Sequence, residues 1–336
     1  MRVILHAGTH KTGTTTLQEV MAANRTWLRA RGVVFPELPG CGASHNVFAH
    51  RLALADDSGR AELRRQIAAA ADPDATLLLS AEEFSARITG PRHWHGFDRP
   101  DYWSRRRAYL YRLRDLLEGL GEVRVLLCYR RADEYAASLY ATNLFSDQFR
   151  WSFATFLRNC APIFDYAAQL ALIREVFADV RAVPFDRLRA DLVPGFFDWA
   201  GLPAPPSTAL HSKATPDARV IGWLQARRQA GGSERDQARA TEFARTARAS
   251  APFRGAPRAW LWPSQLARRA FLDSTTAPEP GFFPDLPDAP AVPPRAITTQ
   301  DLQQVSQAYA AWRGRAPLRA LAPSALGRRI RRLVPL

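Results

Sequence analysis

The feature that most constrains this chain is a run of small residues near the N-terminus, between an apolar segment and an amphipathic one. Residues 2–18 read RVILHAGTHKTGTTTLQ. An apolar run such as RVILH is typical of a buried parallel strand, and the residues from Thr14 onward have helical periodicity. A strand that enters a helix through a glycine-bearing loop presents several backbone N–H groups to one anion. The sequence therefore predicts a phosphate-binding loop in an α/β fold.

The lysine of this loop does not stand where an ATP-binding loop has it. In the ATP pattern, G-x-x-x-x-G-K-[ST], lysine directly follows the second glycine. Gly8 and Gly13 have the required separation, but Thr14 follows Gly13, and Lys11 comes two residues before it. The displaced lysine indicates a phosphate ligand that differs from the β- and γ-phosphates of ATP.

Lysine is also rare in this chain. Of 46 lysines and arginines, only Lys11 and Lys213 are lysine. An ammonium group is a compact charge that can give up a proton, whereas a guanidinium stays protonated. We infer that Lys11 reaches the outer side of the bound phosphate, where a leaving oxygen would lie. The hydroxyls of Thr12, Thr14 and Thr15 are further candidate donors.

Short apolar runs alternate with helical patterns over the first 215 residues. The expected strands are 2–6, 32–36, 75–80, 123–129 and 180–185. The expected helices are 14–30, 45–55, 60–71, 101–120, 130–145, 165–178 and 191–200. Such alternation predicts an α/β fold with a parallel sheet flanked by helices. Ligands of these sheets bind beyond the carboxyl ends of the strands, so the polar residues that follow the strands are candidates for the site.

The character of the chain changes after residue 215. Helical patterns follow at 216–231, 235–250 and 298–312, with a proline-rich connection at 274–297. We expect residues 1–215 to form the α/β core with the nucleotide site. Residues 216–336 are expected to form a helical and proline-rich C-terminal extension, packed on the core as part of one domain.

Charge and composition narrow the class of protein. The net charge of +14 fits an anionic ligand, and three cysteines without paired spacing suit a reducing compartment. With neither a leader sequence nor a long apolar run in view, the sequence predicts a cytoplasmic protein. The tail 317–335 carries five arginines beside a leucine face, which makes it a candidate for contact with a membrane surface.

A second phosphate-binding pattern lies in YRRADEYAASLY, residues 129–140. Arg130 leaves the end of an expected strand, and Ser138 follows eight residues later, about two helical turns into the next element. A guanidinium binds phosphate with two parallel hydrogen bonds, and the Ser138 hydroxyl is placed to meet the same anion. Arg131 is expected to be a solvated neighbour.

These two patterns resemble those of one enzyme family. HKTGTT resembles the 5′-phosphosulfate-binding loop of the sulfotransferases, whose pattern is roughly [PH]-K-[ST]-G-[ST]-[TS], and the Arg130–Ser138 pair is similar to their 3′-phosphate site. The likeness covers mainly residues 1–145 and looks like that of bacterial members. It implies a P-loop NTPase-like sulfotransferase fold and 3′-phosphoadenosine 5′-phosphosulfate as donor, with adenosine 3′,5′-bisphosphate as product and no metal. The residues that it assigns to the donor are Lys11, Thr12, Gly13, Thr14, Thr15, Arg130 and Ser138.

The resemblance implies in-line transfer of a sulfuryl group to a hydroxyl or amine of a carbohydrate, lipid or small-molecule acceptor. Lys11 would neutralise or protonate the bridging oxygen as it leaves. The general base of the family is a histidine or a glutamate. Glu82 and Glu83 follow the strand 75–80, and His45 follows the strand 32–36. All three are candidates, and Glu82 is the first choice because it comes almost directly after its strand.

Other residues and other functions stay open at this point. His6 is expected to point into the sheet and His10 toward the ligand, while Lys213 is a candidate for the 3′ side of the nucleotide. An ATP-dependent P-loop kinase is one alternative, although the loop has no lysine after Gly13. A basic, non-catalytic polyanion-binding protein is another. The sequence shows no interleaved aromatic and basic motif of the RNA-binding kind, so no nucleic-acid partner is expected.

Overall fold

A computed structural model describes most of the chain, in two compact units. The described residues are 1–90, 100–145, 149–206, 217–247, 259–284 and 295–315. Unit 1 contains Met1–Leu139, Thr155–Lys213 and Arg269–Pro287, and unit 2 contains Tyr140–Ala154, Ala214–Arg268 and Asp288–Leu336. The chain thus passes between the units several times, whereas the sequence places one boundary near residue 215. The grouping of both units into one domain stays a prediction.

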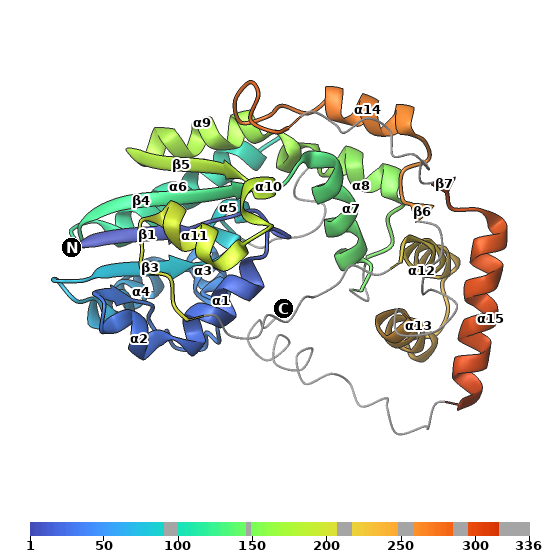
Figure 1. Ribbon diagram of the computed structural model, residues 1–336, viewed down its shortest axis with the longest axis horizontal. Helices are drawn as coiled ribbons and strands as arrows, with labels where there is room; N and C mark the ends of the chain where they lie inside the picture. Colours follow the sequence, from blue (N-terminus) through green and yellow to red (C-terminus); the bar gives the residue numbers. More distant parts are fainter. Residues whose placement is uncertain (91–99, 146–148, 207–216, 248–258, 285–294, 316–336) are drawn as a thin grey trace. The chain divides into compact units, whose positions relative to one another are not determined.

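Unit 1 is built on a five-stranded parallel sheet (Figure 1). Its strands are β1 (Arg2–His6), β2 (Val33–Val34), β3 (Thr76–Ser80), β4 (Glu122–Tyr129) and β5 (Asp179–Pro184). Neighbouring strands are parallel in the order β2-β3-β1-β4-β5. Val3, Ile4 and Leu5 of β1 are at most 1% exposed, because helices cover both faces of the sheet. The predicted parallel sheet flanked by helices is confirmed.

The strand order creates a switch point beside β1. Strand β3 pairs with β1 on one side, and β4 pairs with β1 on the other. The connection after β1 leads to β2, on the side of β3, whereas the connection after β4 leads to β5, on the opposite side. In open α/β sheets a ligand binds in the crevice at such a point. The three loops that carry the predicted site residues of β1, β3 and β4 all begin there.

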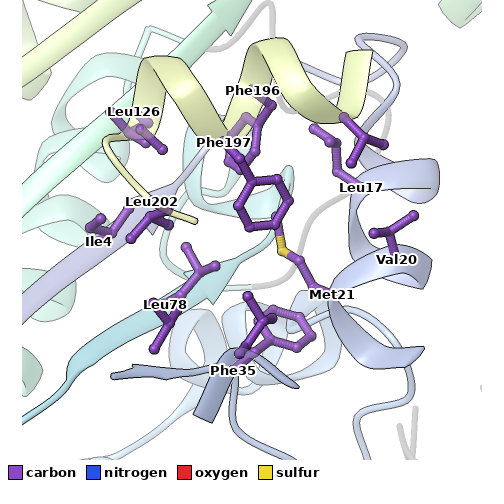
Figure 2. Close-up of a cluster of buried hydrophobic side chains, with 14 residues drawn as sticks. Ile4, Leu17, Val20, Met21, Phe35, Leu78, Leu126, Phe196, Phe197 and Leu202 are labelled. Atoms are coloured by element: carbon purple, nitrogen blue, oxygen red, sulfur yellow. The ribbon is translucent and has the colours of Figure 1, made fainter. Parts of the chain in front are cut away.

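One face of the sheet is covered by helices α1 (Thr14–Ala23), α2 (Arg25–Arg29) and α11 (Leu192–Ala200). Figure 2 shows the buried cluster beneath them, in which Phe197 of α11 points toward Met21 of α1. Ile4, Leu78 and Leu126, one from each central strand, form the sheet side of the same cluster. This packing fixes where α1 begins relative to the sheet, and so where its N-terminus points.

The other face carries α3 (Asn46–Leu54), α4 (Asp57–Ala70), α6 (Tyr102–Leu117) and α9 (Tyr166–Val176) (Figure 1). Buried tyrosines join these helices, since Tyr109 of α6 donates a hydrogen bond to the carbonyl of Ala49 in α3 at 3.3 Å. Two short helices, α5 (Glu83–Ala86) and α10 (Phe185–Leu188), follow directly after β3 and β5. Helix α7 (Ala132–Asn143) follows β4.

The described part of unit 2 is largely helical, as expected for the extension. It contains α12 (Ala218–Ala230), α13 (Glu234–Thr246) and α15 (Thr299–Arg315), and a two-stranded parallel ladder of β6 (Ala259–Trp260) and β7 (Arg295–Ala296). The rings of Trp223, Phe243 and Tyr309 join the three helices.

The sequence did not predict α8 (Phe153–Asn159), the short 3-10 turn η2 (Ala161–Phe164) or α14 (Gln265–Asp273).

The first predicted helix begins at the expected residue but is interrupted before its end. Helix α1 begins at Thr14 with Gly13 as its N-cap, and the predicted helix 14–30 is interrupted at Asn24. The Asn24 side chain donates a hydrogen bond to the Val20 carbonyl at 2.8 Å. A side chain that bonds to its own backbone in this way competes with the helix and ends it.

The predictions for Lys213 and for the tail 317–335 lie outside the described residues, as do parts of the predicted segments 216–231, 235–250 and 274–297. In the described ranges, none of the helices is both long and apolar enough to cross a membrane. The cytoplasmic location stays a prediction.

Candidate functional site

The loop after β1 is held between its two neighbouring strands. The Ala7 N–H donates to the carbonyl of Leu126 at 2.9 Å, and the Thr9 N–H donates to Cys128 at 3.0 Å, both in β4. On the other side, Ala81 after β3 donates to the carbonyl of His6 at 3.0 Å. These backbone hydrogen bonds continue the sheet for a few residues past β1, so the loop is a rigid part of the fold.

Two left-handed residues shape the tip of this loop. Lys11 has φ = 71° and Gly13 has φ = 75°. At position 13 the positive φ favours glycine, and an added Cβ would also lie 2.4 Å from Cδ2 of Leu192. A lysine in this conformation costs about 1–2 kcal/mol relative to the ordinary right-handed region. Such strain at a loop that faces a sheet switch point supports a functional role for the Lys11 side chain.

The threonines of the loop divide into two groups. The buried Thr12 hydroxyl donates to the Thr9 carbonyl at 2.6 Å, and the buried Thr14 hydroxyl donates to Oε1 of Glu82. Both hydroxyl protons are therefore used inside the protein, and these two residues offer a ligand only their backbone N–H groups. Thr15 is partly exposed in the first turn of α1.

The N-terminus of α1 is suited to an anion. Its N-cap makes no side-chain hydrogen bond, and its first turn contains no acidic residue. The first N–H groups of a helix lack partners inside the helix, and the helix dipole places a partial positive charge there. Together with the loop around Lys11, this end of α1 forms a candidate phosphate cradle.

Glu82 is a buried carboxylate that ties this cradle to its surroundings. It is 7% exposed and accepts hydrogen bonds from Asn46 at 2.6 Å, from Gln18 at 3.3 Å and from the Thr14 hydroxyl. Burial raises the pKa of the Glu82 carboxyl, but the charge of His10 and the bonds from Thr14 and Asn46 outweigh it and hold the pKa below its usual range. Glu82 is therefore a charged structural anchor, which makes it a poor base.

Glu83, the next residue, lies between two basic side chains. Its Oε1 is 3.4 Å from Nε2 of His10 and its Oε2 is 2.7 Å from Nε of Arg87. The His10 and Glu83 side chains are 23% and 14% exposed, so this pair is more accessible than Glu82. Glu83 belongs to the site, in contact with the same loop that carries Lys11.

His45 is buried, with 1% of the residue exposed. Its Nδ1 accepts from the Ser80 N–H and its Nε2 donates to the Pro36 carbonyl, each at 2.9 Å. Burial lowers the pKa of His45 to about 4, although the bond to Pro36 opposes this. Both ring nitrogens are occupied by backbone groups, so the geometry favours a structural role for His45 over that of a base.

His6 points into the sheet, as expected. Its Nδ1 is 2.9 Å from the Ser80 hydroxyl, and its ring packs on Phe196 of α11. Burial lowers the pKa of His6 to about 4, with the charge of Glu82 opposing. The ring is neutral near neutral pH and belongs to the core.

The second predicted pattern lies next to the first. The Nη1 of Arg130 donates to the carbonyl of Lys11 at 3.4 Å, and its Nε donates to Glu134 at 3.0 Å. The Arg130 carbonyl in turn accepts from the hydroxyl of Tyr166, at the start of α9, at 2.8 Å. Ser138 lies largely buried on α7. The arginine predicted for one phosphate thus touches the loop predicted for the other.

The prediction that Arg131 is a solvated neighbour is wrong. Arg131 is buried, and its Nε donates to Oδ1 of Asp133 at 2.8 Å. Asp133 is itself buried, and a buried guanidinium is tolerated only beside such a partner. Arg131 therefore helps to anchor the start of α7 while Arg130 faces the loop.

Two members of the site were not predicted in their present roles. The pairing of His10 with Glu83 follows from the adjacency of β1 and β3, since both residues come shortly after the carboxyl ends of these strands. The strand order cannot be predicted from the sequence, so the contact between His10 and Glu83 could not be predicted either. Nothing in the sequence around Tyr166 indicated that its hydroxyl would support Arg130.

Over the described ranges, no three histidine, cysteine or acidic side chains are grouped as they would be around a metal ion.

Comparisons with known proteins add little. No family model matches the chain, and no curated protein matches it. Among solved structures, the chain is similar to a sulfotransferase from Alicyclobacillus acidocaldarius, with 14% sequence identity and a TM-score of 0.39. The match covers 68% of this chain and 92% of that one. A likeness this weak carries no weight for fold or function.

Proposed function

We propose that this protein is a sulfotransferase that uses 3′-phosphoadenosine 5′-phosphosulfate as donor. The observation that carries the proposal is the contact between Arg130 and the carbonyl of Lys11, which are 119 residues apart in the sequence. The lysine loop and the arginine that follows β4 are each predicted to bind one phosphate. Their proximity supports a single ligand with two phosphate groups, as the bisphosphate nucleotide of this donor has.

The residues of the site have distinct parts in this proposal. The loop and the N-terminus of α1 hold the 5′-phosphate through backbone N–H groups, with Thr15 at the first turn. The Lys11 ammonium stabilises the negative charge that develops on the bridging oxygen. Arg130 and Ser138 hold the 3′-phosphate.

Arg130 is prepared for this role by its present contacts. Its ion pair with Glu134 and its bond to the loop fix the guanidinium, which is still 23% exposed. A phosphate would replace or share the Glu134 contact, and a preorganised fork loses little freedom when it binds. The acceptor in this proposal is a hydroxyl or amine of a carbohydrate, lipid or small molecule.

A comparison of two nucleotides tests the proposal. Calorimetry should show that the protein binds adenosine 3′,5′-bisphosphate more tightly than adenosine 5′-monophosphate, which lacks the 3′-phosphate. Arg130→Ala should weaken bisphosphate binding by about 10- to 100-fold, because a hydrogen bond to a charged group contributes about 1.5–3 kcal/mol. The same change should leave the weaker monophosphate affinity as it is.

Arg107→Ala is the matched control, since Arg107 is an arginine of α6 paired with an exposed Glu175. It should change neither affinity. Equal affinity of the wild-type protein for both nucleotides would refute the proposed donor. Tighter binding of ATP in the presence of Mg²⁺ would favour the kinase alternative.

A further inference from the structure

His10 is a second functional side chain on the lysine loop. It directly precedes Lys11, and its Nε2 lies 3.4 Å from Oε1 of Glu83. The two side chains come from the ends of neighbouring strands, β1 and β3, so the sheet itself sets their separation. Both are partly exposed, whereas the other polar groups at this end of β3 are buried. The pair is therefore accessible to a molecule that approaches the loop.

The alternatives for a proton acceptor at this site are weaker. Both ring nitrogens of His45 are bonded to the backbone, so it has no lone pair to offer. Three donors occupy the Glu82 carboxylate, and its low pKa makes it a weak base. Among the described residues, the side-chain contact of His10 is the one from Nε2 to Glu83, and Nδ1 is not part of it.

We propose that His10 is the general base of the sulfuryl transfer and that Glu83 is its positioning residue. This inference rests on the proposed function. The Glu83 carboxylate accepts a hydrogen bond from the N–H at Nε2 of the imidazole. The lone pair of the ring is then on Nδ1. A carboxylate that holds a histidine in this way fixes its tautomer and stabilises the imidazolium that forms.

The step balances as follows. His10 Nδ1 takes the proton of the acceptor hydroxyl while the acceptor oxygen forms a bond to sulfur. The bond between sulfur and the bridging oxygen breaks, and its electron pair stays on the phosphate of the departing bisphosphate. In the proposed function, the ammonium of Lys11 stabilises the charge on that oxygen. The proton on His10 is released to water after the product leaves.

The charges around His10 suit this role. Glu83 faces its ring directly, and the charge of Glu82 also acts on it, since the two are electrostatically coupled. Nε of Arg87 lies 2.7 Å from the other oxygen of the Glu83 carboxylate, and Lys11 is adjacent to His10 along the loop. When the imidazole gains a proton, two carboxylates compensate the new charge.

The first test reads the tautomer of His10 by NMR of the ¹⁵N-labelled protein and needs no acceptor. The wild-type ring should carry its proton on Nε2. In Glu83→Ala the signal should move toward a mixture of tautomers, whereas Glu175→Ala, which removes a carboxylate from a surface pair, should change nothing. A wild-type ring with its proton on Nδ1, or one that Glu83→Ala does not affect, would overturn the proposal.

The second test uses acceptors of different acidity at saturating donor, with His10→Asn compared with the wild type. Transfer to water or ethanol should fall by about 10²- to 10⁴-fold, because their protons need a base. Transfer to 4-nitrophenol, which ionises by itself near neutral pH, should fall far less. Equal losses for all acceptors, or none, would contradict a base role.

The two proposals can fail separately. The bisphosphate affinity of His10→Asn should equal that of the wild type, which shows that the donor site is intact. A wild-type protein that does not bind the bisphosphate contradicts the proposed function. Normal bisphosphate binding with an unchanged rate of transfer to ethanol in His10→Asn contradicts only the role of His10.

Discussion

At the scale of single residues, Lys11 combines an unfavourable backbone conformation with the side chain that we propose acts on the leaving oxygen. Its φ of 71° lies in the region that glycine adopts without cost. A protein that only needed the turn would be more stable with glycine there. The presence of lysine indicates that the ammonium outweighs this penalty.

Two substitutions at this position separate the backbone from the ammonium. Lys11→Gly and Lys11→Ala should both lower sulfuryl transfer by about 10²- to 10³-fold, the usual loss for a group that stabilises transition-state charge. The free energy of unfolding of Lys11→Gly should be about 1 kcal/mol higher than that of Lys11→Ala, because glycine adopts the left-handed conformation without strain. Urea unfolding and donor turnover measure the two effects. Near-normal turnover in either variant would refute the role of Lys11.

At the scale of elements, the first residue of α9 forms a hydrogen bond with the backbone of Arg130. The Asp165 side chain caps this helix by accepting from the Ala168 N–H at 3.0 Å. Tyr166, the next residue, donates its hydroxyl hydrogen bond to the Arg130 carbonyl. The cap thus positions a helix whose first residue holds the arginine of the site.

Removing the cap should therefore weaken both stability and binding. Asp165→Ala should cost about 1 kcal/mol of unfolding free energy, as the loss of an N-cap usually does. It should also lower bisphosphate affinity by about fivefold, the equivalent of about 1 kcal/mol. The control Ser233→Ala removes the cap of α13, in the other unit, and should leave the affinity unchanged. Thermal unfolding and calorimetry give the two readings, and an unchanged affinity in Asp165→Ala would contradict the coupling.

The elements also show how much of the fold can be predicted from the sequence. Strands such as Thr76–Ser80 were predictable because burial on both faces demands an unbroken apolar run. Helices such as α8 were missed because seven residues give too little periodicity to recognise. The residue types of the site were predictable from the loop chemistry. Their pairing was not, since the contact of His10 with Glu83 depends on strand order, and the burial of His45 and Arg131 depends on tertiary packing.

At the scale of the whole molecule, two buried histidines make the fold sensitive to acid. Burial lowers the pKa of both His6 and His45 from the ordinary 6.5 to about 4. The unfolded chain then binds more protons than the folded one at any pH between these values. Stability is therefore complete above pH 6.5 and is lost as the pH falls toward 4.

The free energy of unfolding should accordingly decrease between pH 6.5 and about 4, by at most about 3 kcal/mol for each histidine. Urea unfolding across this range measures the slope. His45→Asn should be less stable at neutral pH but should show a shallower slope, because one of the two titrating rings is gone. A slope as steep as that of the wild type would show that other groups cause the acid sensitivity.

The hydrogen bonds around Glu82 have a consequence for how this sequence can evolve. Its carboxylate gathers Thr14, Gln18 and Asn46 from two separate helices beside the phosphate cradle. Loss of the carboxylate would leave three hydrogen-bond donors without their acceptor. Loss of any one donor would leave a buried charge less well compensated. Descendants of this chain should therefore inherit the four residues together or exchange them together, and in diverged relatives their identities should covary.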